Sequence, residues 1–470
     1  MRQTAGLALR QAFGVRFGTL PTSKRLFSLA YPTERLYGRG MERMQAIFGH
    51  LSGPNRVQNS ASSTLTQNQV KGRFAESEDD VVIVSALRTP IGKAGRGSFK
   101  DTTPDDLLVS VLKATLERTN VNPTDIGDIC VGNVLQPGAG PAVFRIAQFV
   151  AGIPETVPLS ACNRQCSSGL QAVMHVANSI KAGVCDIGIG AGVESMSKRK
   201  QGGDAGDLNP DNFQYQKARD CIIPMGITSE NVAERFGVTR ETQDKFAAIS
   251  QQRACAATDK GLFQDEIVPV KTKIVDKDGQ ERQITVTKDD GVRPGTTKEK
   301  LARLPPAFKK GGSTTAGNSS QVSDGAAAVL VARRSKAREL GLPVFGVIRS
   351  YAVVGVPPDV MGIGPAYAIP EALKKAGLSV DDIDVFEVNE AFASQAVFSV
   401  DKLGIPWEKV NPNGGAIALG HPLGCTGSRQ IATLLNELKR RGKRAYGVVS
   451  MCIGTGMGAA AVIEYPGPQA

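Results

Sequence analysis

Long unbroken apolar runs are missing from the sequence. A transmembrane helix needs about 20 predominantly apolar residues, and no stretch of that length is free of helix breakers. The nearest is residues 445–465, which several glycines interrupt. This stretch is therefore more typical of two buried strands, and the sequence predicts no transmembrane segment.

Aromatic residues are also scarce, at 5% with a single tryptophan. There is no alternation of aromatic and basic residues of the RNA-binding kind, and cysteine and histidine show no zinc-type spacing. The net charge is +11, but residues 1–40 hold seven Lys or Arg against one acidic residue, which accounts for over half of the excess. The remaining charge suits a small anionic ligand better than nucleic acid. We therefore expect no nucleic-acid partner and no metal.

The first 78 residues differ in composition from the rest. Residues 1–40 are basic and poor in acids, as in a mitochondrial transit peptide. After Met41, the pattern Arg43-Met44, five further residues and His50-Leu51 resembles an N-terminal peroxisomal targeting signal, which an import receptor reads. Residues 52–76 are rich in Ser, Asn, Gln and Thr and indicate a linker. We expect a targeting segment and linker over 1–78 and favour the peroxisome, with the mitochondrion as the alternative.

The remaining chain alternates apolar strand patterns with helical ones, which predicts a layered α/β fold with a largely parallel sheet. It also contains an internal repeat, because residues 122–133 are echoed by 379–389, and the block from Cys166 to Gly190 by the block from Cys425 to Ser450. We expect two copies of one α/β unit related by a pseudo-twofold. Residues 199–312 break the rhythm and predict an inserted lid domain. The predicted boundaries are 79–198, 199–312, 313–340 and 341–466.

Three residues stand out as candidates for catalysis. Cys166 precedes Ser-Ser-Gly and a helical pattern, so its sulfur would lie at a helix N-terminus, which favours a thiolate. Most cysteines in such settings are small buried residues, so Cys166 alone is weak evidence for a catalytic site. His421 lies in a Gly-His-Pro turn of the second copy, and Cys452 lies in Met-Cys-Ile-Gly. A site between the copies would join all three.

Four sequence blocks identify the chain as a member of the thiolase family. They are residues 163–171, 389–393, 413–422 and 452–456, and their order and spacing both match. The resemblance covers about residues 79–466 and is greatest to the peroxisomal 3-ketoacyl-CoA thiolases. It implies the five-layer αβαβα thiolase fold, a homodimer, and cleavage of 3-ketoacyl-CoA in fatty-acid β-oxidation. Coenzyme A would be a co-substrate, with no cofactor.

The resemblance also implies roles at the site. Cys166, with a pKa lowered by its helix terminus and by His421, would attack the 3-keto carbon. His421 and a water held by Asn389 would stabilise the enolate oxygen, and the N–H groups of Cys166 and Gly454 would form a second oxyanion hole. Cys452 would move protons, which suits a thiol because its unperturbed pKa, about 8.5, lies close to working pH.

Substrate-contacting residues are implied in the same way. Met225 would lie over the acyl thioester, Ser320 would contact the pantetheine, and Phe392 would line the acyl pocket. Pro224 stands where many acetoacetyl-CoA thiolases have histidine, which favours longer acyl chains.

Two alternative functions remain open. A condensing ketosynthase usually has histidines at the other two catalytic positions, so Cys452 argues against it. An inactive acyl-CoA-binding homologue would be expected to lack one of Cys166, His421 and Cys452. The other thiols are interpreted as packing residues, namely Cys130, Cys162, Cys185, Cys255 and Cys425, and His175 as a buried packing residue on a helix. Residues 188–192 have the wrong spacing for a nicotinamide cofactor.

Overall fold

The computed structural model describes residues 75–199 and 207–468. The proposed targeting residues Arg43, Met44, His50 and Leu51 lie outside this range. Within the described residues, every helix is too short or too polar to cross a membrane.

The first half of the described chain builds one side of the sheet. Its strands run in the spatial order β4-β3-β5-β8-β1, with β3 parallel to β4 and β5, and β8 antiparallel to β5 and β1. Continuous apolar, β-branched sequence explains why β1 is buried along its whole length. The strands are β1 (Val81–Arg88), β3 (Asp128–Gly132), β4 (Leu159–Cys162), β5 (Ile187–Ser195) and β8 (Ser323–Arg333), with the short β2 (Gly92–Lys93) beside β8.

The second half repeats this order as β10-β11-β12-β9. The pair β10–β11 is parallel, like β3–β5. The pairs β11–β12 and β12–β9 are antiparallel, like β5–β8 and β8–β1. A parallel bridge between Phe386 and Val410 stands where β4 stands in the first half. The strands are β9 (Gly346–Gly355), β10 (Val385–Val388), β11 (Ala445–Ile453) and β12 (Met457–Tyr465). The predicted repeat is therefore confirmed.

The prediction of a largely parallel sheet is wrong, since the sheet is mixed. Strands β11 and β12 are joined directly by the turn after Ile453, and such a short connection can only reverse the chain. In the first half, β8 returns antiparallel after the long segment that follows β5. The two halves meet where Val82 of β1 pairs with Val347 of β9.

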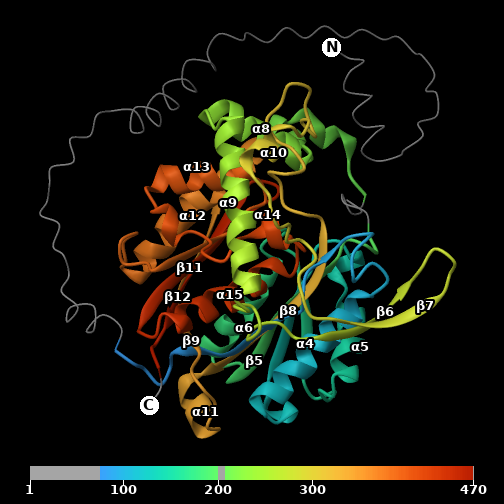
Figure 1. The fold of residues 1–470 in the computed structure, drawn as a ribbon. Helices are drawn as coiled ribbons and strands as arrows, with labels where there is room; N and C mark the ends of the chain where they lie inside the picture. Colours follow the sequence, from blue (N-terminus) through green and yellow to red (C-terminus); the bar gives the residue numbers. More distant parts are fainter. Residues whose placement is uncertain (1–74, 200–206, 469–470) are drawn as a thin grey trace, which may run out of the picture. The chain divides into compact units, whose positions relative to one another are not determined.

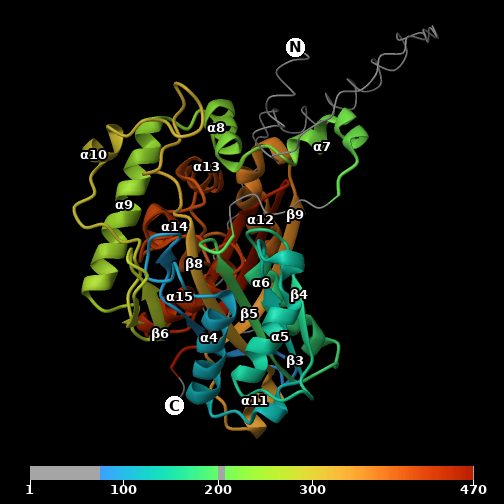
Figure 2. The ribbon, with the colours of Figure 1, turned by 90° about the vertical axis from the view of Figure 1, so that its right-hand side faces the viewer.

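Helices and sheets alternate in five layers (Figure 1). Helices α6 (Ser168–Lys181) and α15 (Thr426–Arg440) form the middle layer and pack on each other and on both halves of the sheet. Helices α4 (Pro104–Thr119) and α5 (Pro141–Val150) cover the outer face of the first half (Figure 2), and α12 (Gly364–Ala376) covers that of the second, with α13 (Ala393–Leu403) beside it. One apolar cluster fills the first outer layer and another fills the space between the halves.

Glycines allow the two central helices to approach closely. A Cβ on Gly169 would lie 2.6 Å from the carbonyl oxygen of Gly424, and one on Gly427 would lie 2.3 Å from the nitrogen of Leu170. Real Cβ atoms do not approach backbone so closely, so any larger residue would push the helices apart. Their N-termini, which follow Cys166 and His421 in sequence, are thereby drawn together.

The segment between β5 and β8 is built mainly of helices, of which α8 and α9 pack on the second half of the fold (Figure 2). A buried ion pair joins it to the first half, because Arg88 of β1 donates to Glu266 at 2.6 Å and to Asp289 at 2.7 Å. The elements are α7 (Gln216–Asp220), α8 (Met225–Phe236), α9 (Arg240–Asp259), β6 (Val270–Val275), β7 (Glu281–Val286) and α10 (Lys298–Ala302). Two further short helices, α11 (Arg334–Glu339) and α14 (Ala416–Leu419), lie in the two halves.

The interpretation of His175 as a buried residue is wrong, because its side chain is exposed. Its apolar neighbours Met174 and Val176 are buried. Successive residues of a helix point about 100° apart, so apolar sequence neighbours do not bury the residue between them.

Candidate active site

The loop that carries Cys166 joins β4 to α6 and is held by its own hydrogen bonds. The Ser168 hydroxyl accepts from the backbone N–H of Arg164 at 2.9 Å and donates to the carbonyl of Gln165 at 2.7 Å. Gln165 has a φ of 47°, a left-handed conformation that is rare outside glycine. Such strain persists where the surroundings impose it and is common at functional sites. The loop thus fixes Cys166 immediately before the helix.

Burial dominates the protonation of Cys166. It raises the pKa of the thiol to about 11, although hydrogen bonds from the backbone N–H groups of Gly454 and of Cys166 itself act in the opposite direction. The expectation of a lowered pKa at the helix terminus is therefore wrong, since desolvation outweighs the helix dipole here. At neutral pH Cys166 is therefore a thiol. The two N–H groups on its sulfur are the ones that were predicted to form an oxyanion hole.

His421 is held in place by its backbone. Gly420 before it has a φ of 115°, and a Cβ there would lie 2.3 Å from the Ser323 hydroxyl oxygen. The N–H of His421 donates to the carbonyl of Gln321 at 3.1 Å. Only glycine satisfies both the dihedral and the space, so this turn needs Gly-His.

Hydrogen bonds define the tautomer of His421. The Thr426 hydroxyl donates to the carbonyl of Pro422 at 3.0 Å, so toward His421 Nδ1, at 2.5 Å, it acts as an acceptor. Nδ1 therefore carries the proton, and Nε2 has a free lone pair that accepts from Asn389 Nδ2 at 3.3 Å. Burial lowers the pKa of His421 to about 3, with Arg429 contributing. The imidazole is therefore neutral, and its Nε2 carries the lone pair that can take a proton.

Asn389 lies just after β10 and is almost completely buried. Its amide nitrogen contacts His421 directly. Its Oδ1 has no hydrogen-bonding partner among the described residues. A buried acceptor of this kind is costly unless a water or a substrate satisfies it, so it is available to hold the predicted water.

Cys452 is fully buried near the end of β11. Burial, and next the proximity of Cys166, raise its pKa well above the ordinary value. The expectation of a near-neutral pKa is therefore wrong, and Cys452 is protonated at rest. The structure brings together one thiol from each half of the fold.

The predicted substrate residues surround Cys452. Phe392 and the partly buried Met225 pack in one apolar cluster with it. Ser320 is joined to the same region, because its N–H donates to the carbonyl of Ala391 at 3.0 Å. A Cβ on Gly454 would lie 3.7 Å from the Met225 sulfur, so Met225 also borders the Cys166 loop.

Several residues around the site were not recognised from the sequence. Phe308 packs edge-on against Phe392, with ring centroids 6.1 Å apart. Glu390 accepts from Ser250 at 2.6 Å and from the N–H of Ile417 at 3.1 Å, which anchors the turn before His421. Glu390 directly follows Asn389 within the thiolase-like block 389–393, so the sequence could have indicated that it lies at the site. Nothing in the local sequence marks Phe308.

Glu194 is a second unrecognised carboxylate. It accepts from the N–H groups of Val134 and Gly424, both at 3.0 Å, and so joins the end of β5 to the turn that follows His421 in the second half. Burial raises its pKa to about 7. Its interactions span 60 and 230 residues of sequence, which is why the local pattern does not reveal them.

Comparison with known families agrees with this geometry. The model for the thiolase N-terminal domain matches residues 81–335, and that for the thiolase C-terminal domain matches residues 342–465. The chain belongs to the thiolase family.

Individual relatives are close. The chain is 67% identical over 428 residues to 3-ketoacyl-CoA thiolase B, peroxisomal, of Rattus norvegicus, covering 91% of this chain and 100% of that one. It is 66% identical over 429 residues to the peroxisomal 3-ketoacyl-CoA thiolase of Homo sapiens, with the same coverage.

Solved structures give the same result. The dimeric peroxisomal thiolase of Saccharomyces cerevisiae superimposes with a TM-score of 0.78 and 50% identity, covering 84% of this chain and 99% of that one. Human mitochondrial 3-ketoacyl-CoA thiolase in complex with CoA gives 0.73 and 40%, covering 83% and 98%. Another structure of the yeast enzyme is described as five-layered, with two core domains of identical topology. The predicted thiolase fold is confirmed.

Proposed function

We propose that the protein is a 3-ketoacyl-CoA thiolase, which uses CoA to shorten 3-ketoacyl-CoA by two carbons in fatty-acid β-oxidation. The observation that carries the proposal is the proximity of two thiols, the partly buried Cys166 and the buried Cys452, with the backbone N–H groups of Cys166 and Gly454 on the Cys166 sulfur. His421, a neutral imidazole whose Nε2 contacts Asn389, lies just before α15, and the start of α15 packs closely against the start of α6 after Cys166. The names of the relatives support the same reaction.

The first half-reaction breaks a carbon–carbon bond. His421 Nε2 takes the proton of Cys166 as the sulfur attacks the 3-keto carbon, and the N–H groups of Cys166 and Gly454 stabilise the oxyanion. The bond between C2 and C3 then breaks, and its electron pair leaves as the enolate of acetyl-CoA. Cys452, protonated at rest, gives its proton to C2. Acetyl-CoA departs and the shortened acyl group stays on Cys166.

The second half-reaction returns every group to its starting state. The Cys452 thiolate takes the proton of incoming CoA, whose sulfur attacks the acyl-Cys166 thioester. The Cys166 sulfur leaves and recovers its proton from His421. Asn389, through its unpartnered Oδ1, would hold the water that helps His421 stabilise the enolate oxygen.

We assign substrate contacts by position. Phe392 and Met225 line the acyl side next to Cys452, and Ser320 contacts the pantetheine. Pro224 in place of a histidine favours acyl chains longer than acetoacetyl. CoA is the co-substrate and no cofactor takes part. We assign the predicted lid over this site to the described part of residues 199–312, in which α8 begins with Met225 of the Cys452 cluster.

We further propose a homodimer in the peroxisome. The yeast relative is described as dimeric and the rat and human relatives as peroxisomal. Arg43, Met44, His50 and Leu51 would be the residues that the import receptor reads, within a targeting and linker segment over 1–78. A fusion of residues 41–60 to a fluorescent protein tests this, with Leu51→Arg as the comparison. Mitochondrial fluorescence of the full chain would contradict it.

Thiolysis of a medium-chain and a short-chain 3-ketoacyl-CoA tests the activity. Wild type is expected to cleave both when CoA is added, with preference for the medium chain, and Cys166→Ala to cleave neither. Cys255→Ala, at a partly buried thiol of α9 that takes no part in the proposed mechanism, is the matched control and should retain activity. Absence of CoA-dependent cleavage in wild type would refute the proposal in favour of acyl-CoA binding without turnover.

A further inference from the structure

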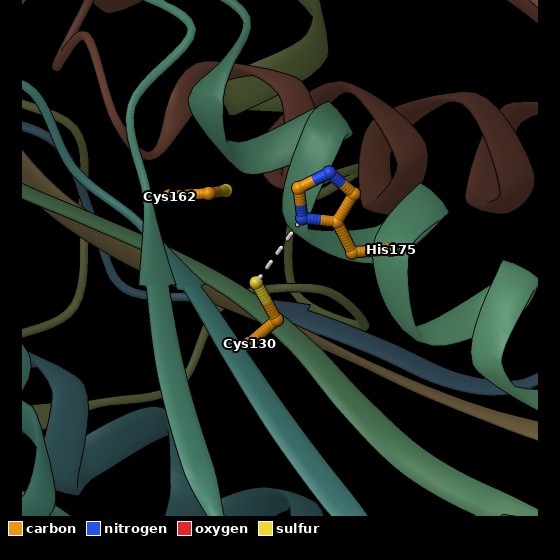
Figure 3. Close-up of side chains that lie close together, drawn as sticks. All are labelled: Cys130, Cys162 and His175. Atoms are coloured by element: carbon orange, nitrogen blue, oxygen red, sulfur yellow. Dashed lines mark hydrogen bonds between the residues drawn. The ribbon is translucent and has the colours of Figure 1, made fainter. Parts of the chain in front are cut away.

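Three ligand-type side chains meet outside the active site (Figure 3). Cys130 of β3, Cys162 at the end of β4 and His175 of α6 point into one space, with their sulfur and nitrogen atoms all within 4.8 Å of one another. The sulfur of Cys130 lies 3.8 Å from His175 Nδ1. Cys130 is buried, Cys162 is partly buried and His175 is exposed. The cluster therefore has one closed side and one that opens to solvent.

The fold brings these residues together from three elements. Strands β3 and β4 are parallel, and Cys130 pairs with Ser160, so Cys162 lies two residues further along on the same face. Helix α6 packs on β3 and directs His175 onto that face. The ligands are thus 32 and 13 positions apart in sequence, a spacing that no zinc-finger pattern matches.

The strand register argues against a disulfide. With a strand spacing of about 4.8 Å and a rise of about 3.3 Å per residue, the two α-carbons lie on a diagonal of about 8 Å. A disulfide requires less than about 7 Å. A metal ion placed between the sulfurs spans the longer distance without moving the strands.

We propose that Cys130, Cys162 and His175 bind a zinc ion. Two thiolates and one imidazole are ligands that zinc prefers, and ligand atoms around one tetrahedral zinc lie about 3.5–4 Å apart. The separation of 3.8 Å between Cys130 Sγ and His175 Nδ1 already meets this. The exposed side at His175 leaves the fourth position to water. This inference does not depend on the proposed thiolase activity.

The chemistry of the pair supports metal binding. Zinc binds cysteine as the thiolate, so binding at this cluster releases the protons of the two thiols. His175 is exposed and Cys162 is partly buried, so an ion can enter from the side of His175.

Metal binding at this cluster would also affect the loop that carries Cys166. The Cys162 sulfur lies 3.5 Å from the carbonyl oxygen of Ser168 and donates to it. Cys166 lies between these two residues in sequence. A zinc-bound thiolate has no proton for this hydrogen bond, so binding replaces it and instead joins Cys162, at the start of the loop, to β3 and α6 through the metal; binding is expected to raise the melting temperature.

Cobalt is the probe for this site, because Co²⁺ replaces zinc and absorbs through thiolate-to-metal charge transfer. The full chain, freed of metal with a chelator, is titrated with Co²⁺ and then with Zn²⁺. We expect one equivalent of cobalt per chain, the charge-transfer band, its loss on adding zinc, and a rise in melting temperature. Cys162→Val and His175→Gln should weaken cobalt binding by more than about 100-fold, since even outer partners of metal ligands contribute 10–100-fold.

Cys166→Ala is the decisive control, because the active site also holds two thiols and an imidazole. The band should survive in Cys166→Ala and disappear in Cys162→Val. The reverse result would place the metal in the active site and overturn the proposal. So would the absence of any band, or a Cys130–Cys162 disulfide in the purified protein. His175 is exposed, so His175→Gln folds normally and keeps the test valid if a cysteine variant does not.

Discussion

The two halves of the molecule share one strand order, yet they supply different chemistry. The helices α6 and α15 occupy equivalent places, and each follows a cysteine, Cys166 in the first half and Cys425 in the second. Cys166 lies beside the N–H of Gly454, whereas Cys425 is 1% exposed and packed among core residues. Burial raises the pKa of Cys425 to about 12. An equivalent position in the fold is therefore not enough to make a cysteine a nucleophile. The thiol also needs neighbouring hydrogen-bond donors and access for the substrate.

The residue before each cysteine shows the same contrast. Gln165 is left-handed, which turns Cys166 toward the site. Gly424 occupies the equivalent place before Cys425, and a Cβ there would lie 2.6 Å from the carbonyl oxygen of Val193. In the first half this turn presents the Cys166 thiol, whereas in the second half the turn before Cys425 packs the two halves together.

The sharpest test of this contrast is to remove each cysteine in turn. Cys166→Ala should lower kcat for thiolysis by at least about 10³-fold, because no other group replaces the nucleophile. Cys425→Ala should leave kcat within about threefold and lower only the stability. Mass spectrometry of the protein quenched with 3-ketoacyl-CoA should show an acyl adduct in Cys425→Ala but not in Cys166→Ala. An adduct on Cys425 would abolish the distinction.

The second half contributes its imidazole, and its loss should be the next largest effect. His421→Asn keeps a polar side chain but cannot accept the proton of Cys166, so kcat/KM should fall by about 10²–10³-fold. Steady-state kinetics at saturating CoA measure this. A fall of less than tenfold would show that the thiol loses its proton by another route.

The pH profile sharpens the same point. The pKa of His421 is lowered to about 3 and that of Cys166 is raised to about 11, so imidazole and thiol keep their forms between these values. The value of kcat/KM should therefore be flat between about pH 5 and 9, falling only as acid begins to protonate His421 or base ionises Cys166. An acid limb near pH 6 to 7 that disappears in His421→Asn would contradict the resting forms described here.

Glu194 connects the halves, and its replacement should affect stability more than activity. Val134 and Gly424 donate to one carboxylate oxygen of Glu194 and Leu135 and Asn133 to the other, so in Glu194→Gln the amide nitrogen must face one pair of donors, which should cost about 1–3 kcal/mol of unfolding free energy. Chemical denaturation measures it, with the exposed Glu155→Gln as control. Because the pKa of Glu194 is raised from 4.5 to about 7, the folded protein binds the extra proton, and stability from this group declines as pH rises through that interval. The variant should lack this decline.

The smallest expected effect is at Gln165. Gln165→Gly removes a left-handed strain of about 1 kcal/mol, partly offset by the greater entropy of glycine when unfolded. The unfolding free energy should rise by up to about 1 kcal/mol relative to Gln165→Ala, which keeps the strain. If the glycine variant is the less stable of the two, the conformation of Gln165 is not strained.

The sequence predicted the features that local motifs encode. The repeat, the thiolase fold and the four catalytic blocks all depend on residues close together in the chain, such as Gly420 with His421. Each also has a steric reason that acts locally, as the positive φ of Gly420 shows. The catalytic roles themselves remain predictions.

What failed depends on contacts between distant segments. The pKa of Cys166 was expected to be low from its helix terminus and His421, but desolvation in the folded protein raises it. The direction of β8 follows from a long connection, not from its own pattern. Glu194, with partners 60 and 230 residues away, has no local signal at all.

The resting protonation of the two catalytic thiols has a consequence for chemical durability. Peroxides and alkylating agents attack thiolates far faster than thiols. In the proposed mechanism the Cys166 sulfur becomes nucleophilic only as His421 Nε2 takes its proton, so the site presents little thiolate to such reagents between turnovers. The desolvation that raises the pKa of Cys166 therefore also protects its sulfur from oxidation between turnovers.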